Sequence, residues 1–297
     1  MKIALLTFPG HTFQTTLSVK SVIKFYQPES IYILVDDLAS NNWKTYTQDL
    51  SLWLTSCFPN TTFIFKLYSE LDFEDCPAGW WRAQLIKLYS DKFIDGDEWL
   101  LIDGDIVFER VTPLKNITPY TCRTMGQDSA VAQLHANYVK RLLGIEQGHL
   151  TVNGEYVATS PVPFRVLSRT MLQGLRDLIE SNHKGNLLKL HLQWFRDQTI
   201  IAYEDPPTRM IMSEWELIEG YRHYVLKEQL PMIEVGSGYP IDKQINGWFP
   251  EPVVYKHSYQ RDLSIGKELF EEQIGFIPTD LWNTAAQWQT EYELNKQ

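Results

Sequence analysis

Alternation between two hydrophobic periods is the feature that most constrains the fold of this chain. Short apolar runs at 2–8, 30–35, 62–67 and 99–102 have the length and composition of buried strands. Between them, apolar residues recur at helical spacing over 19–26, 43–54 and 80–93. Strands that alternate with helices form parallel βαβ units with right-handed crossovers. The first hundred residues therefore predict an α/β fold with a mixed, mostly parallel sheet flanked by helices.

The periodic signal is weaker after residue 110. Helical spacing returns over 131–142, 167–178 and 190–203, and a further helix is predicted after Ser213. Residues 231–252 are rich in Pro and Gly and are predicted to be mostly loop. The chain contains no internal repeat, low-complexity tract or obvious linker. We therefore expect one integrated domain over residues 1–297.

Charge and hydropathy exclude several classes of function. The chain has 27 Lys and Arg against 37 Asp and Glu, a formal net charge of −10. Such a surface repels phosphate backbones, which argues against nucleic-acid binding and docking on anionic membranes. The opening apolar stretch stops at Pro9-Gly10, and no run of about 18 apolar residues follows. We therefore expect no signal peptide, no membrane span and a cytoplasmic location.

Two carboxylates directly follow the fourth predicted strand. They are Asp103 and Asp105, with Gly104 between them. Open α/β sheets bind ligands beyond the carboxyl ends of their strands, where Thr7 and Asp36 also leave their strands. We expect these polar groups to converge at one edge of the sheet. Carboxylate oxygens suit Mg²⁺ or Mn²⁺, and glycine lets a ligand or metal approach the backbone closely. Two solvated Asp residues in an acidic turn are the alternative interpretation.

The strand that runs into this carboxylate pair, after opening βαβ units, resembles the GT-A nucleotide-sugar glycosyltransferases, whose sheet is related to the Rossmann fold. Residues 79–88 (GWWRAQLIKL) resemble the helix that precedes that strand, and residues 213–217 (SEWEL) resemble an acidic motif of some bacterial and viral members. The resemblance implies a hexosyltransferase with a donor half at 1–110 and an acceptor half at 111–297. It would move a sugar from a UDP- or GDP-linked donor to a carbohydrate or other hydroxyl acceptor.

The resemblance also implies roles for particular residues. Mn²⁺ or Mg²⁺ would be held by Asp103, Asp105 and, from near the C-terminus, His257. The donor would contact Asp103 and Gly104, with Thr7 and Asp36 at its base and ribose. On the predicted helix 80–93, Gln84 and Lys87 share one stripe and would point together toward the donor phosphates.

Two candidates compete for the acceptor side. Ser213 and Glu216 have the spacing of a capping box, which gives Glu216 a structural explanation but leaves Glu214 without one. Glu214 is therefore a candidate general base for an inverting reaction. Asp197, followed by Gln198, resembles the Asp-Gln pair of glycogenin-like retaining enzymes. The sequence leaves inversion and retention open.

Two other classes of protein share parts of this pattern. Residues 103–107 (DGDIV) also resemble the nucleophile motif of haloacid-dehalogenase-type phosphatases, in which Asp103 would be phosphorylated with Mg²⁺ bound. In that family the motif usually follows the first strand, whereas here three strands precede it. The other alternative is a non-catalytic nucleotide- or carbohydrate-binding protein that keeps the sheet without the chemistry.

Overall fold

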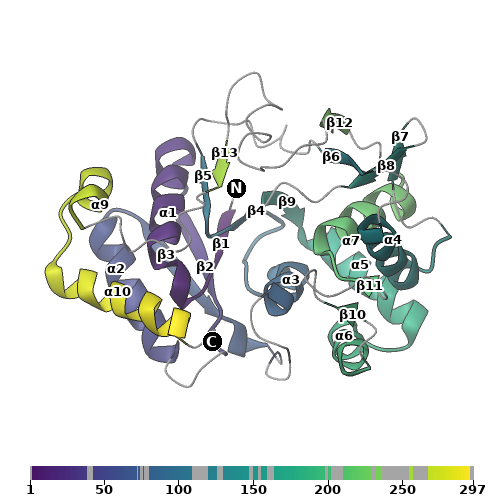
Figure 1. Cartoon of the computed structure of the whole chain (residues 1–297), viewed down its shortest axis with the longest axis horizontal. Helices are drawn as coiled ribbons and strands as arrows, with labels where there is room; N and C mark the ends of the chain where they lie inside the picture. The colour runs from purple at the N-terminus through teal and green to yellow at the C-terminus, as the bar shows by residue number, and fades with distance from the viewer. Residues whose placement is uncertain are drawn as a thin grey trace. The chain divides into compact units, whose positions relative to one another are not determined.

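The structure is a computed structural model that describes residues 2–38, 43–71, 73, 76, 80–108, 120–125, 130–146, 150–152, 155–158, 164–197, 200–201, 210–228, 232–235, 254–256 and 267–294 (Figure 1). Its contacts divide the chain into two compact units. Unit 1 comprises Met1–Glu74, Trp99–Thr112 and Ile245–Gln297, and unit 2 comprises Asp75–Glu98 and Pro113–Gln244. Unit 1 thus joins segments from both ends of the chain.

Unit 1 is built on parallel strands connected by helices. Strands β1 (Lys2–Thr7), β2 (Ser30–Val35), β3 (Thr62–Leu67) and β4 (Glu98–Asp103) run parallel in the order β3-β2-β1-β4. Helices α1 (Thr12–Tyr26) and α2 (Trp43–Cys57) connect the first three. Strands β1, β2 and β4 are almost entirely buried, which explains their continuous apolar runs. The predicted α/β fold with a mostly parallel sheet and flanking helices is confirmed.

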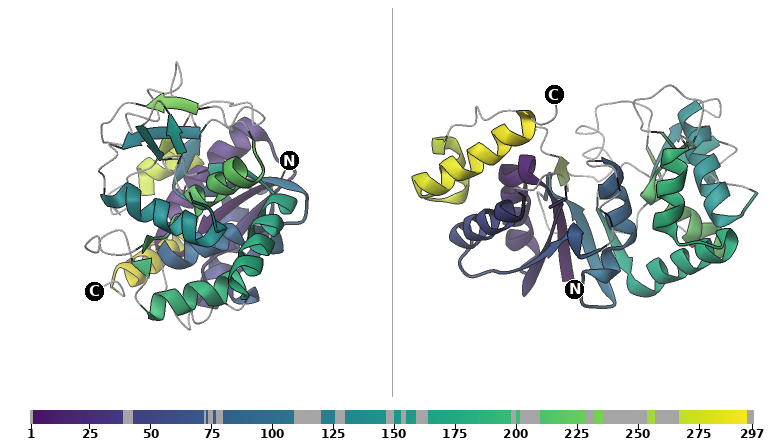
Figure 2. Two further views of the ribbon diagram at one scale, coloured as in Figure 1. Left: turned by 90° about the vertical axis from the view of Figure 1, so that its right-hand side faces the viewer. Right: turned by 90° about the horizontal axis from the view of Figure 1, so that it is seen from below.

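Helices cover this part of the sheet in layers (Figure 2). Helices α1 and α2 lie against the strands, and α9 (Lys267–Ile274) and α10 (Thr279–Leu294) lie outside them. The rings of Phe13, Trp53, Phe270 and Trp282 pack together with centroids 4.8 to 6.4 Å apart. The C-terminal helices therefore share a hydrophobic core with α1 and α2.

A short antiparallel ribbon extends unit 1 beyond β4. The chain turns at Gly104 and Asp105, enters β5 (Ile106–Phe108) and pairs with β13 (Val254–Lys256). The hydroxyl of Ser18 on α1 donates to the carbonyl oxygen atoms of Gly104, at 3.0 Å, and of Ile106. Helix α1 therefore holds the turn that carries the carboxylate pair.

Unit 2 combines helices with a small sheet. Its helices are α3 (Trp80–Leu88), α4 (Ala130–Leu143), α5 (Arg169–His183), α6 (Leu187–Arg196) and α7 (Glu214–Gly220). Strands β6 (Tyr120–Met125), β7 (Leu150–Val152), β8 (Glu155–Ala158) and β12 (Met232–Val235) form a sheet in the order β12-β6-β8-β7. The remaining strands of this unit are β9 (Phe164–Ser168), β10 (Ile200–Ile201) and β11 (Met210–Ile211).

The structure corrects several predictions for the second half of the chain. The helix predicted over 190–203 begins at Leu187 and ends at Arg196, because Asn186 caps its start and the Asp197 N–H bonds to Gln193 at its end. Strands β6 to β9 and helices α9 and α10 were not predicted, although the apolar residues of α10 recur at helical spacing, at Leu281, Ala285 and Trp288. Strand β12 occupies 232–235 within the predicted loop, and residues 236–253 lie outside the described residues. No helix in the described ranges is long and apolar enough to cross a membrane.

Candidate functional site

The carboxyl ends of β1, β2 and β4 meet at one edge of the unit 1 sheet. Leu6 pairs with Asp103 across β1 and β4, and the N–H of Asp36 donates to the carbonyl oxygen of Thr7 at 3.1 Å. The backbones of Thr7, Asp36 and Asp103 are therefore neighbours. The predicted convergence of these strand ends is present, from positions that are far apart in the sequence.

The carboxylate pair lies directly at this edge. Asp103 is the last residue of β4 and is partly exposed, and Asp105 in the following turn is 3% exposed. Two such carboxylates fit Mg²⁺ or Mn²⁺, because these ions accept hard oxygen ligands and keep several waters or substrate phosphates. Among the described residues, no group of three or more His, Cys, Asp or Glu side chains could hold a metal. The predicted third ligand, His257, lies outside those residues.

Gly104 is enclosed by other parts of unit 1. A Cβ at this position would come closer to the carbonyl oxygen of Leu6 than real Cβ atoms do, and would lie 2.9 Å from Oγ1 of Thr15. Packing of the turn against β1 and α1 therefore requires glycine here, whatever binds at the edge. The predicted close approach of a ligand to the Gly104 backbone stays a prediction.

Hydrogen bonds hold the other polar side chains at the edge. Thr7 is 1% exposed, and its hydroxyl lies 2.7 Å from the hydroxyl of Thr15. Asp36, which is 6% exposed, accepts from the N–H of Leu38 at 3.2 Å. These bonds stabilise the ends of β1 and β2. The contacts of Thr7 and Asp36 with a donor also stay predictions.

Two residues that the sequence analysis assigned to different substrates form a buried ion pair in unit 2. Nζ of Lys87 on α3 lies 2.9 Å from Oε1 of Glu214 on α7, and their side chains are 5% and 4% exposed. The same Nζ lies 4.9 Å from the ring centroid of Trp215. Breaking a buried pair leaves an uncompensated charge, so the pair gives both residues a structural role. Gln84, also on α3, is 5% exposed.

Helix α7 carries three buried carboxylates. They belong to Glu214, Glu216 and Glu219, which are at most 4% exposed. The hydroxyl of Ser213 accepts from the N–H of Glu216 at 3.3 Å, which confirms the Ser213 half of the predicted capping box. Glu219 pairs with Arg165 at 3.4 Å and with Arg222 at 3.7 Å. The acidic motif is thus part of a buried, charge-paired helix.

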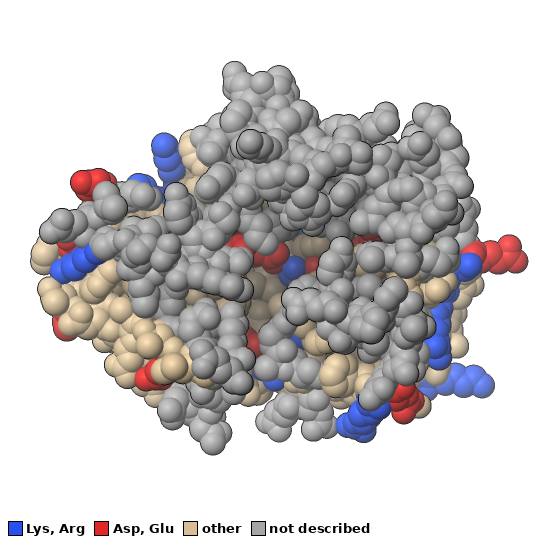
Figure 3. Space-filling view, in the orientation of Figure 1, with Lys and Arg blue, Asp and Glu red and all other residues tan. Residues whose placement is uncertain are grey.

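The second acceptor candidate has a different environment. Asp197 is exposed at the C-terminal end of α6, and Gln198 lies outside the described residues. Basic side chains on α5 and α6 reach the surface in the same region of unit 2, beside exposed acidic ones (Figure 3). Besides Asp197, the exposed charged residues of this part of the chain are Asp177 and Glu180 on α5, Lys184 directly after α5, and Lys189 and Arg196 on α6. Interspersed charges of both signs are typical of a solvated surface.

A buried series of hydrogen bonds beside α7 was not predicted from the sequence. The Tyr138 hydroxyl lies 2.7 Å from Nε2 of His191, whose Nδ1 lies 2.7 Å from the carbonyl oxygen of Leu187. Burial lowers the pKa of His191 to about 4, so the ring is neutral and Nδ1 carries the proton. Burial and the nearby Glu214 charge raise the pKa of Tyr138 well above its usual value. Tyr138 was recognisable only as an apolar position of a helix.

Fold and site together define a class of protein, an α/β protein with a carboxylate pair at the carboxyl edge of a parallel sheet. The chain belongs to the family of unknown function DUF6492, whose sequence model matches residues 10–196, more than half of the chain. No curated protein matches the chain closely enough to count as a relative.

Several solved structures are similar to this one. A galactosyltransferase LgtC in complex with donor and acceptor sugar analogues is 14% identical, with a TM-score of 0.45 over 96% of this chain and 100% of that one. The bifunctional glycosyltransferase WbbM in its apo form is 14% identical, with a TM-score of 0.35 over 65% of this chain and 36% of that one. The apo form of the glycosyltransferase GlyE from Streptococcus pneumoniae TIGR4 is 12% identical, with a TM-score of 0.35 over 99% of this chain and 63% of that one. These similarities are too distant to transfer the role of any residue.

Proposed function

We propose that this protein is a metal-dependent glycosyltransferase that moves a hexose from a nucleotide-diphosphate donor to a hydroxyl acceptor. One observation carries the proposal: Asp103 ends β4 beside the ends of β1 and β2, and Asp105 follows two residues later. Ligands of open α/β sheets bind at such an edge. A cation held there by the paired carboxylates would let an acidic protein bind an anionic diphosphate.

In this proposal Asp103 and Asp105 hold the cation. A bound Mn²⁺ or Mg²⁺ would act as a Lewis acid and neutralise charge on the departing diphosphate. His257, which lies outside the described residues, stays the proposed third ligand.

The other residues would bind and orient the two substrates. Asp36 would accept from a ribose hydroxyl or a base N–H next to Thr7, and Gln84 and Lys87 would contact the phosphates. Glu214 and Asp197 are alternatives on the acceptor side. Glu214 would serve an inverting reaction as general base, whereas Asp197 would serve a retaining one. The configuration of the product, measured by NMR, distinguishes these two assignments.

Thermal shift with UDP-, GDP- and CMP-linked sugars, with and without Mn²⁺, tests the proposal. We expect one nucleotide class to raise the Tm by several degrees only when Mn²⁺ is present, because a ligand at 100 times its Kd stabilises the folded state by about 2.7 kcal/mol. Asp103→Asn and Asp105→Asn should abolish the shift. Glu180→Gln, at an exposed position on α5, should keep it.

Three results would contradict the proposal. One is the absence of any nucleotide-dependent shift in the wild-type protein. Another is turnover of simple phosphoesters with a phosphoenzyme trapped on Asp103, which would favour the phosphatase interpretation. Binding of a nucleotide-sugar without its hydrolysis or transfer to any acceptor would favour a non-catalytic binding protein.

A further inference from the structure

The side chain of Tyr46 on α2 reaches the turn that follows β1. Its hydroxyl donates to the carbonyl oxygen of Phe8 at 3.2 Å and lies 3.1 Å from the hydroxyl of Thr12. Phe8 and Thr12 flank the short helical turn Pro9–His11, which connects β1 with α1. One buried phenol therefore contacts both ends of the connection that leaves the proposed donor-binding edge.

The Tyr46 hydroxyl belongs to a small hydrogen-bond network at this turn. It donates to Phe8 and contacts the hydroxyl of Thr12, which itself donates to the carbonyl oxygen of Pro9 at 3.3 Å. Tyr46 is 1% exposed, and burial raises its pKa far above the usual value. The hydroxyl therefore stays protonated, and remains a donor to Phe8, across the physiological pH range.

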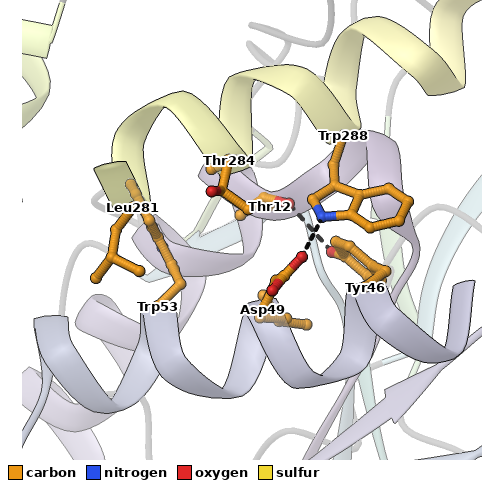
Figure 4. Close-up of a pocket in the computed structure, with 9 residues that line it drawn as sticks. Thr12, Tyr46, Asp49, Trp53, Leu281, Thr284 and Trp288 are labelled. Carbon is orange, nitrogen blue, oxygen red and sulfur yellow. Dashed lines mark hydrogen bonds between the residues drawn. The ribbon is translucent and has the colours of Figure 1, made fainter. Parts of the chain in front are cut away.

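The C-terminal helix holds the ring of Tyr46. Trp288 on α10 meets that ring edge-on, with centroids 5.4 Å apart, and its Nε1 donates to Oδ2 of Asp49 on α2 at 2.8 Å. Figure 4 shows Tyr46, Asp49 and Trp288 around a small pocket between α2 and α10, with Thr12 on its wall. Helix α10 also packs directly against the β1–α1 turn, and Tyr46 adds a contact that joins α2, α10 and this turn.

We propose that Tyr46 is a positioning residue of the donor site, which fixes the β1–α1 turn and is itself fixed by α10. This inference rests on the proposed function. The turn begins one residue after Thr7, whose carbonyl oxygen accepts from Asp36 at the same edge as Asp103. A turn that is already ordered loses little conformational entropy when a nucleotide binds against it. Tyr46 therefore contributes to donor affinity without touching the donor.

Tyr46→Phe tests the proposal because it removes only the hydroxyl. We expect faster amide exchange in residues 8–12, including the His11 N–H that donates to Phe8. We also expect the Kd for the nucleotide-sugar with Mn²⁺ to rise about three- to tenfold, the effect of one lost neutral hydrogen bond, with kcat at saturating donor little changed. Thr12→Ser keeps the hydroxyl and should bind as wild type does, whereas Thr12→Val should resemble Tyr46→Phe. Tyr32→Phe makes the same chemical change within β2 and serves as the matched control.

Two outcomes overturn this inference alone. One is unchanged amide exchange at residues 8–12 in Tyr46→Phe, and the other is equal nucleotide affinity in Tyr46→Phe and wild type. If wild type itself binds no nucleotide, the proposed function fails and this inference fails with it. The two failures are distinguishable, because a wild-type protein that binds no nucleotide is identified before any variant is made.

Discussion

Gly104 and Asp105 form a turn directly after Asp103, and two neighbouring elements enclose this turn. The β1 backbone and Thr15 of α1 leave no space for a side chain at Gly104, and Ser18 of α1 binds the Gly104 carbonyl. The spacing of the carboxylates and their place after a strand were predictable from the sequence. The contacts that require glycine were not, because they come from residues almost a hundred positions earlier in the chain.

Gly104→Ala should therefore destabilise the protein by about 1–3 kcal/mol, the usual range for overpacking a well-packed site. Chemical denaturation measures this loss. Gly185→Ala is the matched control, because the nearest atom to its added Cβ would be the His183 carbonyl oxygen at 3.9 Å. Its stability should stay within about 0.5 kcal/mol of wild type. Equal stability of the two variants would show that the turn can relax around a methyl group.

At the scale of elements, helices α4 and α6 of unit 2 each bury a histidine. His191 on α6 bonds through both ring nitrogen atoms, to Tyr138 and Leu187. His135 on α4 is 7% exposed, and within the described residues neither of its ring nitrogen atoms has a hydrogen-bond partner. Burial lowers the pKa of both histidines from 6.5 to about 4. As the pH falls below about 6.5, the two histidines bind protons in the unfolded chain before they do so in the folded one. Their contribution therefore leaves the free energy of unfolding unchanged above pH 6.5 and lowers it as the pH falls toward 4.

His135→Leu should raise the free energy of unfolding at pH 7.5 by about 1 kcal/mol, because it removes a buried polar group without a partner. Its stability should also fall less steeply than that of wild type between pH 6.5 and 4. His191→Leu should lower the free energy of unfolding at pH 7.5 by about 1–3 kcal/mol, because the buried Tyr138 hydroxyl loses its acceptor. Urea denaturation across this pH range measures both variants. A loss of stability in His135→Leu at pH 7.5 would contradict this account.

At the scale of the whole chain, the C-terminal helices complete a core that the first strands and helices begin. Phe270 of α9 is 2% exposed among Phe13, Trp53 and Trp282. Phe276, six residues later in the connection to α10, is 84% exposed. Two phenylalanines close in sequence therefore differ almost completely in burial.

Phe270→Ala should destabilise the protein by about 3–5 kcal/mol, the usual cost of truncating a buried phenylalanine. Phe276→Ala should change stability by less than about 0.5 kcal/mol. Thermal denaturation of the two variants compares them directly. Similar effects of both substitutions would indicate that α9 does not belong to the core of unit 1.

The sequence by itself determined the alternating strands and helices of the first hundred residues and the meeting of Thr7, Asp36 and Asp103 at one edge of the sheet. Both follow from hydrophobic period and strand direction, which are local properties. Only the tertiary structure decided that Lys87 pairs with Glu214, 127 residues away, and that α10 supports Tyr46. Such contacts depend on how distant elements pack together, and no local pattern in the chain records that packing.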